Sequence, residues 1–237
     1  MGGQTAEKNP LSPRDQRMLR DILRVLVRPV ELWAFLDDEE NSADLAAVLL
    51  QLDRLARDRL TVHIADGETA SGLLLALGIG KKPTLRIVGP GGEFAPVEIV
   101  GAPRGYQFGA LIHLLAAISG GRTGLPYAAR RMAKNVKHDI LLEVGVTPTC
   151  PHSPQVVRIA QDFALTNPAR IFARSVDLVQ MTTGAGVLTD AVPVLTVYVD
   201  GKVMASHVGT LSAERMSRLI QYSFKGGSRH AGGLQHH

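Results

Sequence analysis

Apolar residues follow two different spacings along the chain, and these spacings predict alternating strands and helices. Four short apolar runs predict strands, and they span residues 30–36, 59–64, 139–146 and 170–176. Leucines recur at helical spacing through residues 42–57, which predicts a helix between the first two strands. Residues 154–166 predict a second helix between the other two strands. A strand, a helix and a second strand in this order make a right-handed parallel crossover.

Both halves of the chain then continue with the same pattern of a proline, a strand, a tight turn, another strand and a helix. The matched positions are Pro83 with Pro193, the turns 89–93 and 200–201, and Gly101 with Gly209. This order of elements is the one that a thioredoxin-like domain requires. The sequence therefore predicts an α/β protein of two fused thioredoxin-like domains, each a mixed central sheet flanked by helices. The alternative is one ordinary α/β domain with a chance internal similarity.

The same pattern predicts where the domains begin and end. A thioredoxin-like domain that lacks an active-site cysteine is expected at residues 15–121, and a second one at 137–225. Residues 122–136 are expected to form a helical connector between them. The Gly- and His-rich tail, residues 226–237, is expected to be disordered.

Composition excludes several classes of protein. The 237 residues are 45% hydrophobic with a formal net charge of +4, and the basic residues form no dense stripe of the kind that binds nucleic acid. Neither a signal peptide nor an apolar run of about 18 residues is present, so we expect a cytoplasmic protein that is not in the membrane. One cysteine excludes a disulfide framework, a cysteine-rich zinc site and an internal redox couple. We expect no metal and no bound cofactor.

The single cysteine, Cys150, follows a predicted strand and precedes a predicted helix. The first amides of a helix lack internal partners, and its dipole places partial positive charge there, so both favour a thiolate. We therefore expect the pKa of Cys150 to lie below the free value of about 8.5. Pro151 suits the first helical position, and His152 adds a favourable charge when it is protonated. The alternative is a buried and inert cysteine.

Several segments resemble one family in order and spacing over about residues 17–222. In the first half they are Arg28-Pro-Val-Glu-Leu, Leu36-Asp-Asp, Ser42-Ala-Asp-Leu, Lys82-Pro and Val100-Gly-Ala-Pro-Arg-Gly-Tyr-Gln-Phe. In the second half they are Thr149-Cys-Pro-His-Ser-Pro, Leu165-Thr-Asn-Pro, Val192-Pro-Val and Val199-Asp-Gly-Lys. The chain thus resembles the N-terminal domain of the alkyl hydroperoxide reductase F subunit and the archaeal protein disulfide oxidoreductases. In that reductase, a C-x-x-C in the second fold relays electrons from a flavin-dependent domain to a peroxiredoxin.

The resemblance implies a thiol–disulfide oxidoreductase with Cys150, Ser153 and Pro193 at its catalytic centre. Thr149, Pro151, His152, Val192 and Gln107 are its supporting residues. It also implies a cis Val192–Pro193 bond, with the Val192 backbone offered to an extended disulfide substrate. A trans proline on an edge strand is the alternative. Pro83 is the counterpart of Pro193 in the half without a thiol.

Three departures from the family change the expected mechanism. No G-x-G-x-x-G lies between a strand and a helix, so we expect an external flavin-dependent reductase and a disulfide-bearing acceptor such as a peroxiredoxin. Gln107 stands where the family often has a glutamate, and an amide does no acid–base work. Ser153 stands where the second cysteine is expected, so an attack by Cys150 stops at the mixed disulfide. The serine is either natural or a substitution for cysteine.

Two other classes of function remain open from the sequence. A C-x-x-S motif resembles the monothiol glutaredoxins, which hold an iron–sulfur cluster with glutathione, although Pro151-His152 does not match their Gly-Phe pair. The other is a redox-inert interaction scaffold with Cys150 as a relic. The pair between the two active-site positions, Pro151-His152, is also the pair found in the strong periplasmic oxidant of the DsbA type, so it predicts an oxidising site if residue 153 is a cysteine.

Overall fold

A computed structural model describes residues 13–37, 40–65, 67–80, 83–181 and 191–225. The first half contains α1 (Pro13–Leu23), β1 (Val30–Phe35), α2 (Glu40–Ala56), the 3-10 turn η1 (Arg57–Arg59), β2 (Leu60–Ala65), α3 (Gly67–Leu77), β3 (Thr84–Val88), β4 (Val97–Val100) and α4 (Tyr106–Gly120). Helix α5 (Tyr127–Lys134) follows within the expected connector. The second half contains β5 (Ile140–Val146), α6 (Ser153–Thr166), β6 (Ile171–Asp177), α7 (Leu178–Met181), β7 (Val194–Val199), β8 (Lys202–Val208) and α8 (Ala213–Lys225).

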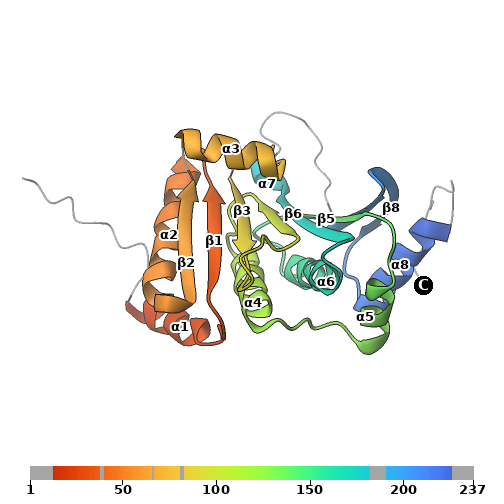
Figure 1. The fold of residues 1–237 in the computed structure, drawn as a ribbon, viewed down its shortest axis with the longest axis horizontal. Coiled ribbons are helices and arrows are strands. Elements are labelled where there is room, and N and C mark those ends of the chain that lie inside the picture. The colour runs from red at the N-terminus through yellow and green to blue at the C-terminus, as the bar shows by residue number, and fades with distance from the viewer. Residues whose placement is uncertain (1–12, 38–39, 66, 81–82, 182–190, 226–237) are drawn as a thin grey trace, which may run out of the picture.

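One mixed sheet runs through the molecule in the order β2-β1-β3-β4-β6-β5-β7-β8 (Figure 1). Strand β1 pairs with β2 in parallel and with β3 antiparallel, and β3 pairs with β4 antiparallel. Strand β5 makes the same pairings with β6 and β7, and β7 pairs with β8. The expected repeat is therefore confirmed, and the parallel pair β4–β6 joins the two halves into a single sheet.

The repeat extends to individual hydrogen bonds. Gly101 has a φ of +97° and donates its N–H to the Pro83 carbonyl oxygen at 2.7 Å. Gly209 has a φ of +95° and donates to the Pro193 carbonyl oxygen at 2.8 Å. Such backbone angles favour glycine because it lacks a Cβ. The two glycines matched in the sequence thus close the same turn in both halves.

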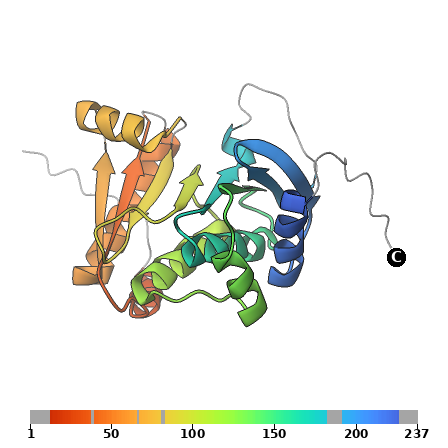
Figure 2. The same ribbon diagram turned by 45° about the vertical axis from the view of Figure 1, so that its right-hand side comes forward.

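Helices α3 and α7 lie at the end of the sheet opposite to α1 and α5 (Figure 1). Helix α4 of the first half packs against α6 of the second, as Figure 2 also shows. One cluster of buried side chains extends from Leu19 in α1 to Ile220 in α8. The two halves therefore share a core, and the exact division into two domains stays a prediction.

The sequence pattern missed three helices, α1, α3 and the short α7. Helix α1 lies in a polar, charged segment, yet Leu19 and Leu23 are buried on its inner face. Two leucines four residues apart are enough to dock an amphipathic helix, although they are too few to stand out in a sequence. Helix α3 was also not predicted. Among the described residues, no helix has the length and apolar character needed to cross a membrane. The tail expected to be disordered lies outside the described residues.

Candidate redox site

Cys150 lies in the loop that joins β5 to α6. Strand β5 ends at Val146 and α6 begins at Ser153, so the cysteine precedes the helix by three residues in sequence. The Cys150 N–H donates to the carbonyl oxygen of Thr147 at 3.3 Å, which closes a turn directly before the sulfur. Thr149, within this turn, is exposed.

The helix begins at Ser153, one residue before the predicted range of 154–166, although Pro151 was expected at its first position. The prediction that Pro151 is the first helical residue is wrong, because Pro151 and His152 form a bend and Pro154 lies in the first turn of α6 instead. A proline is tolerated in the first turn because the N–H it lacks would have no partner there. His152 occupies the N-cap position of the helix, and its side chain makes no capping hydrogen bond. The N–H groups of His152 and Ser153, at the start of this helix, are directed at the sulfur, and both bond to it.

Hydrogen bonds lower the pKa of Cys150 even though burial opposes them. Only 8% of the residue is exposed, and burial by itself raises the pKa of a thiol because a thiolate loses hydration. The Ser153 hydroxyl and the backbone N–H groups of His152 and Ser153 outweigh this effect, so the pKa lies below its ordinary value. The next two residues, Pro151 and His152, are exposed, so Cys150 lies close to the protein surface. The surroundings of Cys150 therefore differ from those of a cysteine buried in an apolar core, which would have a raised pKa.

Ser153 is fully buried in the first turn of α6. Its hydroxyl oxygen is buried and has no geometric hydrogen-bond partner among the described residues. It lowers the pKa of Cys150 because it donates to the thiolate. A buried hydroxyl without a partner is costly, so ionisation of Cys150 satisfies a group that is otherwise unpaired.

The second wall of the site is the segment before β7. The Val192–Pro193 bond is cis, as the resemblance implies. The Cys150 thiol donates to the Val192 carbonyl oxygen, with 3.6 Å between sulfur and oxygen. Pro193 is buried and Val192 is half-buried. Two segments from different parts of the second half therefore meet at the sulfur. Lys82, which precedes the counterpart Pro83, lies outside the described residues.

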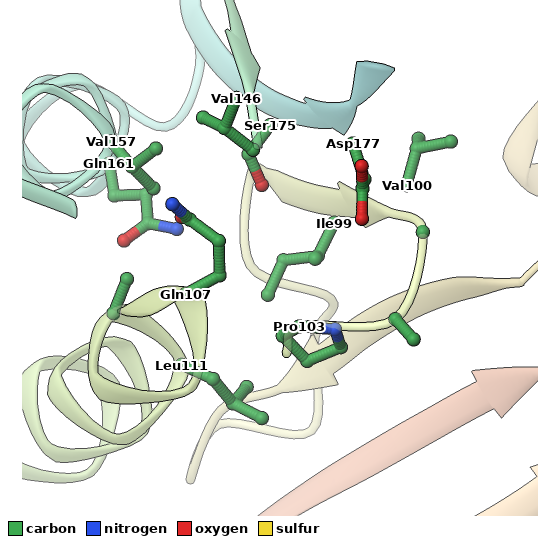
Figure 3. A pocket seen from close by; sticks show the side chains of 13 residues that line it. Ile99, Val100, Pro103, Gln107, Leu111, Val146, Val157, Gln161, Ser175 and Asp177 are labelled. Carbon is green, nitrogen blue, oxygen red and sulfur yellow. The ribbon is translucent and has the colours of Figure 1, made fainter. Parts of the chain in front are cut away.

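Gln107 lies in α4 of the first half and is buried, and its side-chain nitrogen has no hydrogen-bond partner among the described residues. It lines a small interior cavity between the halves, where its amide is directed toward Gln161 of α6 (Figure 3). Ser175 and Asp177 of β6 line the same cavity. Cys150 is not among the lining residues. Gln107 thus belongs to the interface of the two halves, and a supporting role at the sulfur stays a prediction.

A loop of the first half touches the cysteine loop, which the sequence did not predict. The Tyr106 N–H donates to the Pro148 carbonyl oxygen at 3.1 Å. Gly105 has a φ of +54°, and a Cβ at this position would collide with the same oxygen. The one signal in the sequence was the glycine itself, because the contact needs both its backbone angle and its lack of a side chain.

No group of three or more His, Cys, Asp or Glu side chains suited to a metal ion occurs in the part of the chain that the structure describes.

No family model matches the chain. Among curated proteins, the alkyl hydroperoxide reductase F subunit of Escherichia coli K12 is 26% identical over 150 residues, which is 63% of this chain and 26% of that protein. Its counterpart in Pseudomonas putida is 23% identical over 150 residues. Among solved structures, the N-terminal domain of the Enterococcus faecalis F subunit superposes with a TM-score of 0.74 at 21% identity, covering 88% of this chain and 98% of the domain. The chain has the fold of this N-terminal domain.

The protein disulfide oxidoreductase of Aeropyrum pernix has the same fold, with a TM-score of 0.71 at 22% identity, and the match covers 89% of this chain and 92% of that protein. These matches confirm the resemblance and the tandem thioredoxin-like architecture. The chain spans about a quarter (26%) of the length of the reductase relatives that it matches. The activity of the complete reductase subunits therefore supports a proposal for this chain and does not establish its function.

Proposed function

We propose that the chain is a thiol–disulfide oxidoreductase of the electron-relay type, with Cys150 as its nucleophile. The observation that carries this proposal is the meeting of three features at one sulfur: a lowered pKa, the N–H groups before α6 and the Val192 carbonyl beside the cis proline. A thiolate is the form that attacks a disulfide, so a site that favours the thiolate favours this reaction.

In the proposed step, the Cys150 thiolate attacks one sulfur of a partner's disulfide. The partner's S–S bond breaks, a new S–S bond joins Cys150 to the partner, and the second partner sulfur leaves as a thiolate. The N–H groups of His152 and Ser153 and the Ser153 hydroxyl hold the negative charge of Cys150 before the attack. The backbone of Val192 is suited to pair with an extended substrate segment, in the manner of strand addition.

Ser153 determines where this reaction ends. A thiol at this position would attack the mixed disulfide, release the reduced partner and leave a disulfide between positions 150 and 153, so that two electrons pass to the partner. A serine hydroxyl does not resolve a mixed disulfide. The chain with Ser153 therefore holds its partner covalently until another thiol, such as glutathione, arrives.

The partners follow from the chemistry and from the relatives. The acceptor is a disulfide-bearing protein of the peroxiredoxin type, because the matched relatives belong to an alkyl hydroperoxide reductase. The donor in this proposal is a flavin-dependent reductase. A cytoplasmic location, where thiols are kept reduced, is part of this proposal.

A pair of variants tests the proposal. The unsubstituted chain, with Ser153, is mixed with a chromogenic aromatic disulfide. It should release one equivalent of the coloured thiol, after which the reaction should stop at the mixed disulfide. The Ser153→Cys variant, supplied with thioredoxin reductase and NADPH or with a small dithiol, should reduce the disulfide over many turnovers. The Cys150→Ser variant is the control and should do neither.

A Ser153→Cys variant that folds but does not turn over would contradict the relay. Anaerobic reconstitution of the chain as written with iron, sulfide and glutathione is the second measurement. A visible absorbance band that depends on Cys150 would favour the monothiol glutaredoxin type of protein over the relay.

A further inference from the structure

We propose that Gln180 is a positioning residue for Cys150, because its side-chain amide fastens residues 101–105 of the first half to the second half and this loop supports the turn that carries the sulfur. The inference rests on the proposed function and deepens it, since it assigns the first half a part in the redox site.

Gln180 lies in α7, directly after β6, and its side-chain amide bonds to both backbone groups of Ala102. The Ala102 N–H donates to Gln180 Oε1 at 2.9 Å, and Gln180 Nε2 donates to the Ala102 carbonyl oxygen at 3.4 Å. The two residues are 78 positions apart in the sequence. Ala102 is 2% exposed, so its backbone groups depend on protein partners and not on water.

Asp177 holds the Gln180 side chain in place. Gln180 Nε2 donates to Asp177 Oδ2 at 2.6 Å, and the Val179 and Gln180 N–H groups donate to Asp177 Oδ1 at 3.0 Å and 3.4 Å. Asp177 is 4% exposed, and a Cβ at Gly101 would lie 2.6 Å from its Cβ. The end of β4 is therefore pressed against the end of β6 at the point where Gln180 bonds to Ala102. Figure 3 shows Asp177 and Pro103 beside this junction.

The same loop then reaches the cysteine turn. Three residues after Ala102, the Gly105 backbone packs against Pro148 so closely that no side chain fits, and the Tyr106 N–H donates to the Pro148 carbonyl oxygen. Pro148 lies inside the turn that the hydrogen bond from Cys150 to Thr147 closes. Contact is thus continuous from Gln180 to the loop and from the loop to the turn.

The two ends of this path start from adjacent strand positions. Val146, the last residue before the cysteine turn, pairs with Asp177 across the β5–β6 ladder. The turn that carries Cys150 is therefore held at its start by β5 and at Pro148 by the first-half loop. Loss of the Gln180 bonds frees the loop and lets the turn move, so the N–H groups of His152 and Ser153 spend less time directed at the sulfur. The thiolate then loses part of its stabilisation, and the pKa of Cys150 rises.

The test compares Gln180→Ala and Gln180→Glu with the unchanged chain and with Gln221→Ala, which alters an exposed glutamine on α8. Gln180→Glu keeps the size of the side chain but loses the Nε2 donor to Ala102 and Asp177. None of the residues of α7 is buried in the core, so both variants are expected to fold. The rate of Cys150 alkylation by iodoacetamide is measured from pH 4 to pH 10, and folding is checked by thermal unfolding.

Both Gln180 variants should raise the midpoint of the alkylation profile by about half a pH unit or more, so that the rate at pH values well below the midpoint falls about threefold or more. Gln221→Ala should leave the profile unchanged. Folded Gln180 variants with an unchanged midpoint would overturn the inference, whatever their thermal stability, because a merely structural residue lowers stability without moving the midpoint. Failure of the proposed function is distinguishable, because it would show in the unchanged chain as a midpoint at the free-cysteine value.

Discussion

The sulfur of Cys150 lies 3.6 Å from the carbonyl oxygen of Val192, a residue 42 positions further along the chain. This contact joins the loop before α6 to the cis Val192–Pro193 bond. It leaves the sulfur between the N–H groups that stabilise a thiolate and the Val192 carbonyl oxygen.

The Ser153 hydroxyl should contribute to the reactivity of Cys150. Replacing Ser153 by alanine removes a donor to the thiolate, so the pKa of Cys150 should rise and the alkylation midpoint should move upward by about half a pH unit or more. The unchanged chain should have a midpoint below about 8.5. Ser206→Ala, at an exposed position on β8, is the control. A Ser153→Ala midpoint equal to that of the unchanged chain would show that the backbone N–H groups act alone.

The lowered pKa of Cys150 also links ionisation to stability. A thiol whose pKa is lower in the folded state than its unfolded value of about 8.5 stabilises the fold at pH values above about 8.5. This contribution is lost as the pH falls through the folded-state pKa. The destabilisation caused by Cys150→Ser should therefore be larger at pH 9 than at pH 5. Urea unfolding of both proteins at the two pH values measures the difference. A smaller effect at pH 9 would contradict the lowered pKa.

The Ser153→Cys variant should be more oxidising than thioredoxin. Its dipeptide would be Pro-His, the pair of the DsbA-type oxidant, and a stabilised thiolate stabilises the reduced form and raises the potential. Equilibration against glutathione redox buffers should give a potential above about −270 mV, the thioredoxin value. A potential at or below that value would mean that the dipeptide does not set the redox poise in this fold.

Asp177 should make the free energy of unfolding depend on pH with a sign opposite to that expected for Cys150. Burial raises the pKa of Asp177, although hydrogen bonds from Gln180 and Val179 and the charge of Arg104 oppose it. An acid with a raised folded pKa stabilises the fold most below its unfolded pKa of about 3.9, and this contribution is lost as pH rises through the folded pKa. The stability of Asp177→Asn relative to the unchanged chain should therefore improve from pH 4 to pH 7. Denaturant unfolding at several pH values checks this, and a relative decline would refute it.

The two matched glycines should respond differently to alanine. Both have a positive φ, so each Gly→Ala change costs about 1–2 kcal/mol for the backbone alone. At Gly209 a Cβ meets nothing within 4 Å, whereas at Gly101 it lies 2.6 Å from the Cβ of Asp177. Gly101→Ala should therefore destabilise the chain by about 1–3 kcal/mol more than Gly209→Ala. Urea unfolding measures both variants, and equal costs would mean that the β4–β6 junction yields to the extra atom.

Local patterns in the chain were enough to predict the repeated order of elements, because hydrophobic spacing, prolines and glycines act on their immediate neighbours. The turn glycines Gly101 and Gly209 were matched from position alone, and the structure gives them the same hydrogen bond to a proline carbonyl. Cys150 was predicted to be the reactive sulfur because one cysteine lies between a strand and a helix, and the structure places it between β5 and α6. The predicted start of that helix, residue 154, lies within one residue of the observed start at Ser153. The assignment of Pro151 to the first helical position was wrong, because Pro151 and Pro154 both satisfy the rule for a helix start and only the packed chain selects between them.

What surrounds the sulfur, and what holds its loop, depends on long-range packing instead. Gln107 matches a family motif by position, yet its amide lies in the cavity between the halves, because the packing of α4 against α6 directs it there. The contacts from Gln180 to Ala102 and from Tyr106 to Pro148 join residues far apart in the sequence. Such contacts form where two strand ends become neighbours in the β4–β6 pairing, and no local pattern of residues encodes which strand ends will meet.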